Sequence, residues 1–141
     1  MPDAAFGLEG LRKYRDDIAD MDKKPQDYFQ SPWRGCHAIQ GQRWMRHCTA
    51  AYLAKASADC PDHTRKGILA DAAHLFEESC AQWDDYDTLL SREAADEGAW
   101  GNPASRREGA RAVGRAIERE AAAIEKLRPL TAQVRKADAP G

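Results

Sequence analysis

Cys36 is the residue whose type and position best suit covalent chemistry. It falls in the opening turns of a helix expected to start at 31–32, where unpaired backbone N–H groups and the helix dipole favour the thiolate. Adjacent helical residues point in different directions, so the neighbouring His37 is not placed to act as its base. The sequence therefore leaves open a small cysteine-dependent acyltransferase or hydrolase that uses Cys36 with His47, His63 or His74. The alternative is a Gly-Cys-His turn that only packs the end of a helical bundle.

The four cysteines and four histidines give a poor pattern for metal ligands. Zinc sites usually pair ligands two to four residues apart in each half, and only Cys60 and His63 have this spacing. His37 and Cys48 share one side of the second helix but are three turns apart, roughly 16 Å. We therefore predict no metal and no cofactor, with Cys48 and Cys80 as small buried hydrophobic residues.

His74 belongs to half of a di-iron motif, the sequence DAAH. A di-iron bundle needs two Glu-x-x-His motifs and two further carboxylates. The chain has no second copy, so we expect His74 to lie near the surface and to pair with Glu78 one turn later.

Aromatic and polar side chains gather on the second and third predicted helices. Most of the aromatic rings are expected in the core, because aromatic residues bury large areas and dominate bundle packing. Their polar tips need partners, which favours a polar-edged pocket between these two helices. The residues predicted to bind a ligand there are Gln40, Arg43, Trp44, Cys48, Phe76, Gln82, Trp83 and Tyr86.

The apolar spacing predicts an all-α fold, an antiparallel bundle of about four helices. Alanine, Arg, Glu and Leu are abundant and no alternating strand pattern occurs. We expect one domain over 1–141, with 1–6 and 136–141 frayed at the ends. We expect four helices, which run from Asp3 or Leu8 to Met21, from Ser31–Pro32 to Ala58, from Asp62 or Thr64 as far as Gly98, and from Asn102–Pro103 to Arg128. Pro129 follows directly and should end or kink the last helix.

Two apolar stripes make specific predictions about packing. On the second helix, Trp44, Cys48 and Tyr52 follow at four-residue steps and are expected to face the core. On the last helix, a narrow stripe with nearly heptad spacing comprises Ala110, Val113, Ile117, Ala121, Ile124 and Leu127. Because narrow seams are typical of paired helices, we predict a homodimer through this helix.

Composition restricts the partners. The 21 basic and 23 acidic residues give a net charge of −2 and form no long block of one sign, which argues against a nucleic-acid partner. No apolar run approaches the roughly 20 residues that span a bilayer, and the N-terminus lacks the pattern of a signal peptide. We therefore predict a cytoplasmic protein with reduced thiols and no membrane contact.

The chain contains the segments GLEGLRKYRDDIADM, RGCHAIQGQRWMRHCTAAYLAKAS and LADAAHLFEESCAQWDDYDTLL, which together span about Gly7 to Leu90. These three segments resemble the helical domain of unknown function that follows the catalytic domain in proteins of the butirosin-biosynthesis acyltransferase type. Where this family usually has a glycine-rich turn followed by Arg, the chain has only Gly35 and Gly41. The catalytic Cys and His of the family lie in the preceding domain, so the resemblance transfers no catalytic residue.

These observations favour a binding or accessory module of bacterial specialised metabolism, a setting that the resemblance alone implies. Such a module would hold a small molecule or a partner protein between the second and third helices. The enzyme that uses Cys36 is the alternative, and an assembly subunit that docks through its last helix is a third hypothesis.

Overall fold

The chain forms four α-helices and one π-helical turn in the parts that the computed structural model describes, which are residues 7–20, 32–91 and 101–137. For 32–40, 91 and 133–137 the description covers the backbone alone. The elements are α1 (Gly7–Ala19), α2 (Pro32–Asp59), α3 (His63–Tyr86), η3 (Asp87–Ser91) and α5 (Pro103–Ala137). The predicted all-α class is confirmed. Of the ends expected to fray, 1–6 and 138–141 lie outside the described residues, whereas 136–137 belong to α5.

Asp62 and Asn102 begin two of the helices as predicted. The Asp62 carboxylate accepts a hydrogen bond from the backbone N–H of Arg65 at 2.8 Å. The Asn102 side-chain oxygen accepts one from the backbone N–H of Ala104 at 2.9 Å. Pro103 takes the first helical position, where a missing N–H costs nothing. Local capping therefore fixes where α3 and α5 start.

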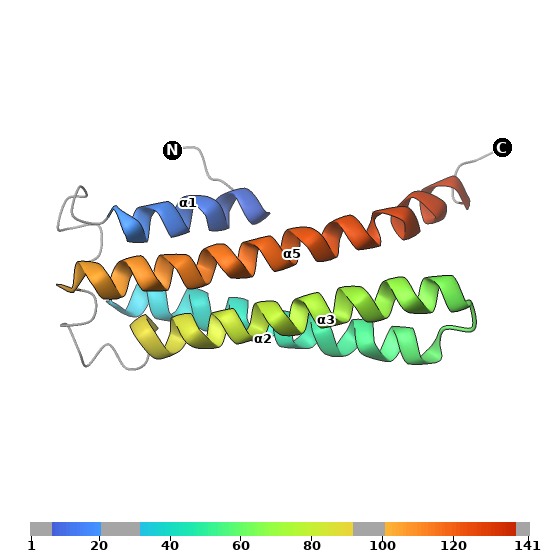
Figure 1. Ribbon diagram of the computed structural model, residues 1–141, viewed down its shortest axis with the longest axis horizontal. Helices are drawn as coiled ribbons and strands as arrows, with labels where there is room; N and C mark the ends of the chain where they lie inside the picture. The colour runs from blue at the N-terminus through green and yellow to red at the C-terminus, as the bar shows by residue number, and fades with distance from the viewer. Residues whose placement is uncertain (1–6, 21–31, 92–100, 138–141) are drawn as a thin grey trace.

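Pro129 was predicted to end or kink this helix near Arg128, and because it lies inside α5 the first of these two alternatives is wrong. The helix continues for two turns beyond the proline, to Ala137. Proline removes one backbone donor and crowds the preceding turn, which bends a helix without necessarily ending it. Figure 1 shows the last turns of α5 directed away from the line of its first part.

The long helices lie side by side, and successive ones run in opposite directions (Figure 1). At one end of the α2–α3 pair Arg43 contacts Asp87, and at the other end Ser57 donates to the carbonyl of Lys66. Along α3 and α5, Lys126 contacts Asp71, whereas residues near the start of α5 meet the end of α3. The shorter α1 lies along the N-terminal half of α5.

Two apolar clusters occupy the two halves of the bundle. The first joins α1, the end of α3 and the start of α5, and contains Ile18, Trp83, Tyr86, Leu90, Ala110, Ala112, Val113, Ala116 and Ile117. The second joins α2, the start of α3 and the later part of α5, and contains Leu53, Ala72, Ala73 and Ala123, with Leu69, Leu75, Phe76 and Leu127 at its edge. Polar side chains lie between these clusters, and they determine how α2 is oriented.

The α2 helix buries a different side from the one that its aromatic residues predict. Trp44 and Tyr52 are 65% and 72% exposed and Cys48 is exposed, so the prediction that they face the core is wrong. Arg43 and Arg46 instead turn toward the other helices. Between 41 and 59, where the side chains of α2 are described, the buried residues are Ala50, Leu53 and Ser57. The physical reason is that Arg46 pairs with a buried carboxylate on α5, Glu120. The helix α2 is therefore rotated so that Arg46 points toward α5.

The apolar stripe of α5 is covered mainly by its own chain. Val113 and Ile117 belong to the first apolar cluster, packed with α1 and α3. Ile124, at 45% exposed, is the large hydrophobic residue that stays accessible among the described side chains of α5. The predicted homodimer through this helix remains a prediction, although three of the six seam residues, Ala110, Val113 and Ile117, are already buried. None of the described helices has the length and apolar character needed to cross a bilayer.

Replacement of Ile18 by alanine tests the docking of α1. Ile18 is fully buried in the first apolar cluster, so Ile18→Ala should lower the free energy of unfolding by about 2–5 kcal/mol. The matched control is Ile124→Ala, where the same atoms are removed from a half-exposed site and the loss should be less than about 1 kcal/mol. Urea unfolding followed by circular dichroism measures both. Equal losses would show that α1 is not held by this residue.

Candidate functional site

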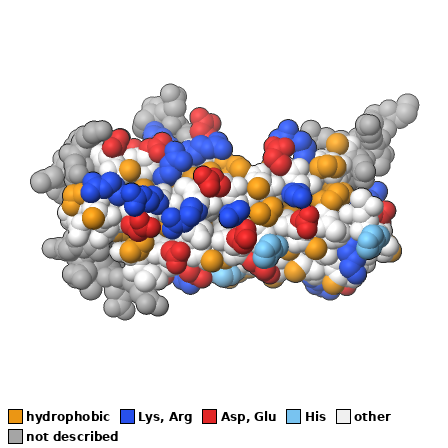
Figure 2. All heavy atoms as spheres, in the orientation of Figure 1, with side chains coloured by type: hydrophobic (Ala, Val, Ile, Leu, Met, Phe, Trp, Pro, Cys, Tyr) orange, Lys and Arg blue, Asp and Glu red, His pale blue; other side chains and the backbone are white. Residues whose placement is uncertain are grey.

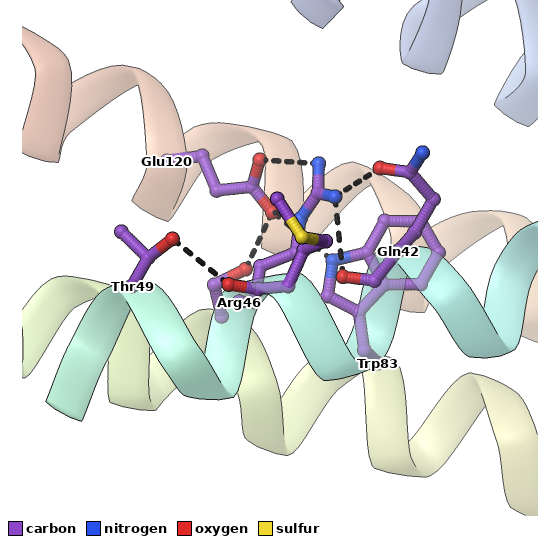
Figure 3. A network of polar contacts seen from close by, with 7 residues as sticks. Gln42, Arg46, Thr49, Trp83 and Glu120 are labelled. Carbon is purple, nitrogen blue, oxygen red and sulfur yellow. Dashed lines mark hydrogen bonds and ion pairs between the residues drawn. The ribbon is translucent and has the colours of Figure 1, made fainter. Parts of the chain in front are cut away.

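A buried carboxylate, Glu120 of α5, lies at the centre of the molecule between the two apolar clusters. Its Oε1 atom accepts hydrogen bonds from Arg46 Nε at 2.9 Å, Ser79 Oγ at 2.8 Å and Trp83 Nε1 at 3.0 Å. Its Oε2 atom accepts one from Arg46 Nη2 at 3.0 Å. Figure 3 shows Arg46 and Trp83 converging on the carboxylate. Three helices, α2, α3 and α5, are thus joined at one side chain.

Arg46 is held in place from several sides. Its guanidinium lies 5.5 Å from the ring centre of Trp83, a cation–π arrangement. Its Nη1 atom donates to the side-chain oxygen of Gln42 and, at 3.2 Å, to the backbone carbonyl of the same residue (Figure 3). The planar fork of arginine makes such simultaneous contacts possible, which the ammonium of lysine does not.

The Glu120 carboxylate is stabilised in its charged form. Burial alone would raise its pKa, but the hydrogen bonds from Arg46 and Trp83, the positive charge of Arg46 and the hydrogen bond from Ser79 outweigh burial and lower the pKa below the ordinary value of a glutamate. Three donor contacts converge on Oε1 and one on Oε2, and the side chain is only 5% exposed. Glu120 therefore acts as a structural anion that a ligand cannot reach from solvent.

The residues predicted to form a pocket between α2 and α3 do not all face one space. Trp83 and Tyr86 are fully buried in the core, whereas Trp44 and Cys48 face outward from α2. Burial also raises the pKa of the Cys80 thiol, which the prediction correctly places in the core.

The other members of the predicted pocket are engaged elsewhere. Arg43 Nε contacts Asp84 at 2.5 Å and Arg43 Nη1 contacts Asp87 at 3.2 Å. Gln82 accepts from Arg115 Nε of α5 at 2.5 Å. Phe76 lies at the edge of the second apolar cluster, and the side chain of Gln40 lies outside the described atoms.

The three residues predicted to be catalytic are far apart along the bundle. Cys36 and His47 are both on the continuous helix α2, eleven residues and therefore about 16 Å apart. The side chain of Cys36 lies outside the described atoms. His74 is on α3, exposed, and pairs with Glu78 at 3.5 Å as predicted. Within the described residues, no three His, Cys, Asp or Glu side chains cluster as metal ligands.

An open groove of about 470 Å³ lies between α1 and the N-terminal half of α5. Small residues allow the two helices to approach here, and a Cβ atom at Gly114 would lie 3.4 Å from Arg15 Cδ. The lining residues are Arg15, Asp16 and Ala19 of α1 and Arg107, Ala110, Arg111, Gly114, Arg115 and Glu118 of α5. Figure 2 shows basic side chains gathered over this part of the molecule, with acidic ones among them.

The four arginines of the groove were not predicted from the sequence as binding residues. Arg107, Arg111 and Arg115 follow at four-residue steps and so share one side of α5. This spacing was a usable signal, but the fourth arginine, Arg15, comes from a helix more than 90 residues earlier. Only the packing of α1 on α5 reveals that the four line one groove.

Comparison with protein-family models, with curated proteins and with solved structures finds no match. The resemblance to the butirosin-type helical domain therefore stays a prediction. The function of this chain has to be argued from its own side chains.

Removal of one partner of the buried ion pair tests the network. Arg46→Met leaves the Glu120 carboxylate buried without its cation, so the free energy of unfolding should fall by about 3–5 kcal/mol. Adding Glu120→Gln should recover part of this loss, because the amide oxygen still accepts from Ser79 and Trp83 while the uncompensated charge is gone. Denaturant unfolding of the single and double variants measures both effects.

The control for this experiment is Arg43→Met. Arg43, which is also on α2, pairs with the carboxylates of Asp84 and Asp87. Its side chain is 37% exposed, so this change should cost less than about 1 kcal/mol. Losses that simply add in the double variant, or an equal loss from Arg43→Met, would show that the buried pair has no special role.

Proposed function

We propose that the chain is a binding module that takes a small organic phosphate in the groove between α1 and α5. The observation that carries this proposal is the set of four arginines, from two helices, around one groove of about 470 Å³. This keeps the predicted small-molecule role but moves the ligand away from the α2–α3 interface, whose centre the Glu120 network occupies.

The groove has an excess of positive charge. Its lining includes four arginines against two carboxylates, Asp16 and Glu118, which leaves a net charge of +2 (4 − 2). Arg107 makes no hydrogen bond or ion pair within the described part of the chain, so its guanidinium is free to meet a ligand. An anion entering this groove would therefore meet donors from both helices.

The ion pairs that the other arginines make are weak enough to be exchanged. Arg15 contacts Asp16 at 2.7 Å. Arg111 contacts Glu108 at 2.9 Å, and Arg115 contacts the same carboxylate at 3.7 Å. These side chains are 36–69% exposed, and exposed pairs contribute only about 0–1 kcal/mol. Each guanidinium has five donors, so a second anion can bind without complete loss of the first contact.

Size and shape favour a small phosphorylated molecule. The planar fork of arginine binds two oxygens of a phosphate at once, a stronger arrangement than a single point charge. Arg107 and Arg115 are eight residues apart, about 12 Å along the helix, which suits one compact ligand better than a nucleic-acid strand. The small residues Ala19, Ala110 and Gly114 leave room for the organic part of that ligand.

Arg111→Gln tests this proposal, with Arg128→Gln as its matched control. Both arginines lie on α5, are 69% exposed and pair with a glutamate three residues earlier, but only Arg111 lines the groove. Inorganic pyrophosphate should bind the unmodified protein in titration calorimetry, more weakly as salt rises. Arg111→Gln should weaken binding about tenfold or more, as expected for loss of a charged hydrogen bond, whereas Arg128→Gln should leave it unchanged.

Two results would contradict the proposal. One is a failure of pyrophosphate to bind at low ionic strength, and the other is equal weakening by both variants. A parallel titration with citrate identifies the ligand class, because tighter binding of citrate than of pyrophosphate would replace the phosphate by a polycarboxylate.

A further inference from the structure

The outward side of α2 between Gly41 and Ala54 is a long surface without any carboxylate or lysine. The two arginines of this segment, Arg43 and Arg46, turn inward to pair with acidic residues on α3 and α5. The exposed residues are Gly41, Gln42, Trp44, Met45, His47, Cys48, Ala51, Tyr52 and Ala54. We call these nine residues the α2 face. It extends over about 20 Å of helix.

The α2 face holds most of the large apolar side chains that the molecule exposes. Four large hydrophobic residues are exposed among the residues that the structure describes, and three of them, Trp44, Met45 and Tyr52, are on this face. In a chain that is 31% charged, an uncharged surface rich in aromatic residues is distinctive. Such surfaces are typical of interaction sites, where Trp, Tyr and Met are enriched and Lys and Glu depleted.

The α2 face can pair with a second copy of itself that runs in the opposite direction, because its aromatic residues lie at equal distances on either side of Cys48. Trp44, Cys48 and Tyr52 follow at four-residue steps, so Cys48 is the midpoint. If two copies of α2 pair antiparallel about a two-fold axis at Cys48, Trp44 of each copy meets Tyr52 of the other. The aromatic pairs give favourable packing, and the face has no lysine, arginine or carboxylate that would lie opposite its own copy.

From this arrangement we propose that the α2 face binds a second copy of the chain, in an antiparallel two-fold dimer with its axis at Cys48. A symmetric interface must be complementary to itself, which the face satisfies. The interface uses none of the groove residues between α1 and α5, so it is independent of the proposed phosphate site. It also differs from a dimer through the last helix, for which Ile124 is the exposed apolar residue.

The area of the face limits the strength of the dimer. An aromatic side chain offers 150–250 Å² when fully exposed, so Trp44 and Tyr52 at 65% and 72% exposure contribute roughly 200–350 Å² together. The smaller residues of the face add to this, but the sum stays near or below the roughly 800 Å² per partner of a stable interface. The dimer should therefore be weak and dissociate on dilution.

Sedimentation velocity over an approximately hundredfold range of concentration tests the proposal, with a reversible monomer–dimer equilibrium expected. Trp44→Ser should weaken the dimer at least tenfold while circular dichroism shows an unchanged helix content, because this side chain contributes little to the core. Ile124→Asp is the control and should leave the equilibrium unchanged. A protein that is monomeric at every concentration, or a dimer that only Ile124→Asp dissociates, would overturn the proposal.

Charge reversal at the axis distinguishes this pairing from any other use of the same face. Cys48→Asp and Cys48→Lys each place like charges opposite one another across the two-fold axis, so each variant alone should be monomeric. An equimolar mixture of the two should recover a heterodimer. If either variant alone dimerises like the unmodified protein, or if the mixture stays monomeric, the axis is not at Cys48 and the proposal is wrong.

Discussion

The buried carboxylate of Glu120 is the constraint on which the arrangement of the bundle depends. A charge in this position is stable only if a cation and further donors surround it. Arg46 of α2 supplies the cation, while Ser79 and Trp83 of α3 supply neutral donors. These three contacts fix the rotation of α2 and the register of α3 against α5, because a shift of one residue would remove a donor from the carboxylate. Polar groups buried between apolar clusters commonly select one packing among several.

This constraint also explains where binding surfaces occur. The network fills the space where α2, α3 and α5 meet, and its charged side chains are only 13% and 5% exposed, so a ligand cannot reach them there. Because Arg46 faces inward, Trp44 and Tyr52 on the other side of α2 are left exposed. Because α1 covers only part of α5, a groove forms where these two helices meet. Both proposed binding surfaces are therefore consequences of how the helices pack and lie away from the centre.

Local features of the sequence predicted local features of the fold. The caps at Asp62 and Asn102 depend on neighbouring residues, so the starts of α3 and α5 could be inferred without tertiary information. Glu120 could not be assigned in this way, since its donors come from helices 37 and 74 residues away in the sequence. A usable hint was its position seven residues after Val113, on the buried side of α5. The prediction that Trp44 is buried failed for the same reason. The aromatic stripe of α2 suggested the buried side of the helix, but the partner that turns Arg46 inward, Glu120, is on a distant part of the sequence.

Titration of the Glu120 carboxyl carbon by ¹³C NMR tests the central claim most directly. The pKa should lie below the ordinary range of a glutamate, and the indole N–H signal of Trp83 should shift in the same transition. Because the folded pKa is lowered, the stability this group contributes is present above the unfolded pKa and is lost as pH falls through the folded one. A carboxyl group that titrates above the ordinary range, or a Trp83 signal that does not respond, would contradict the account.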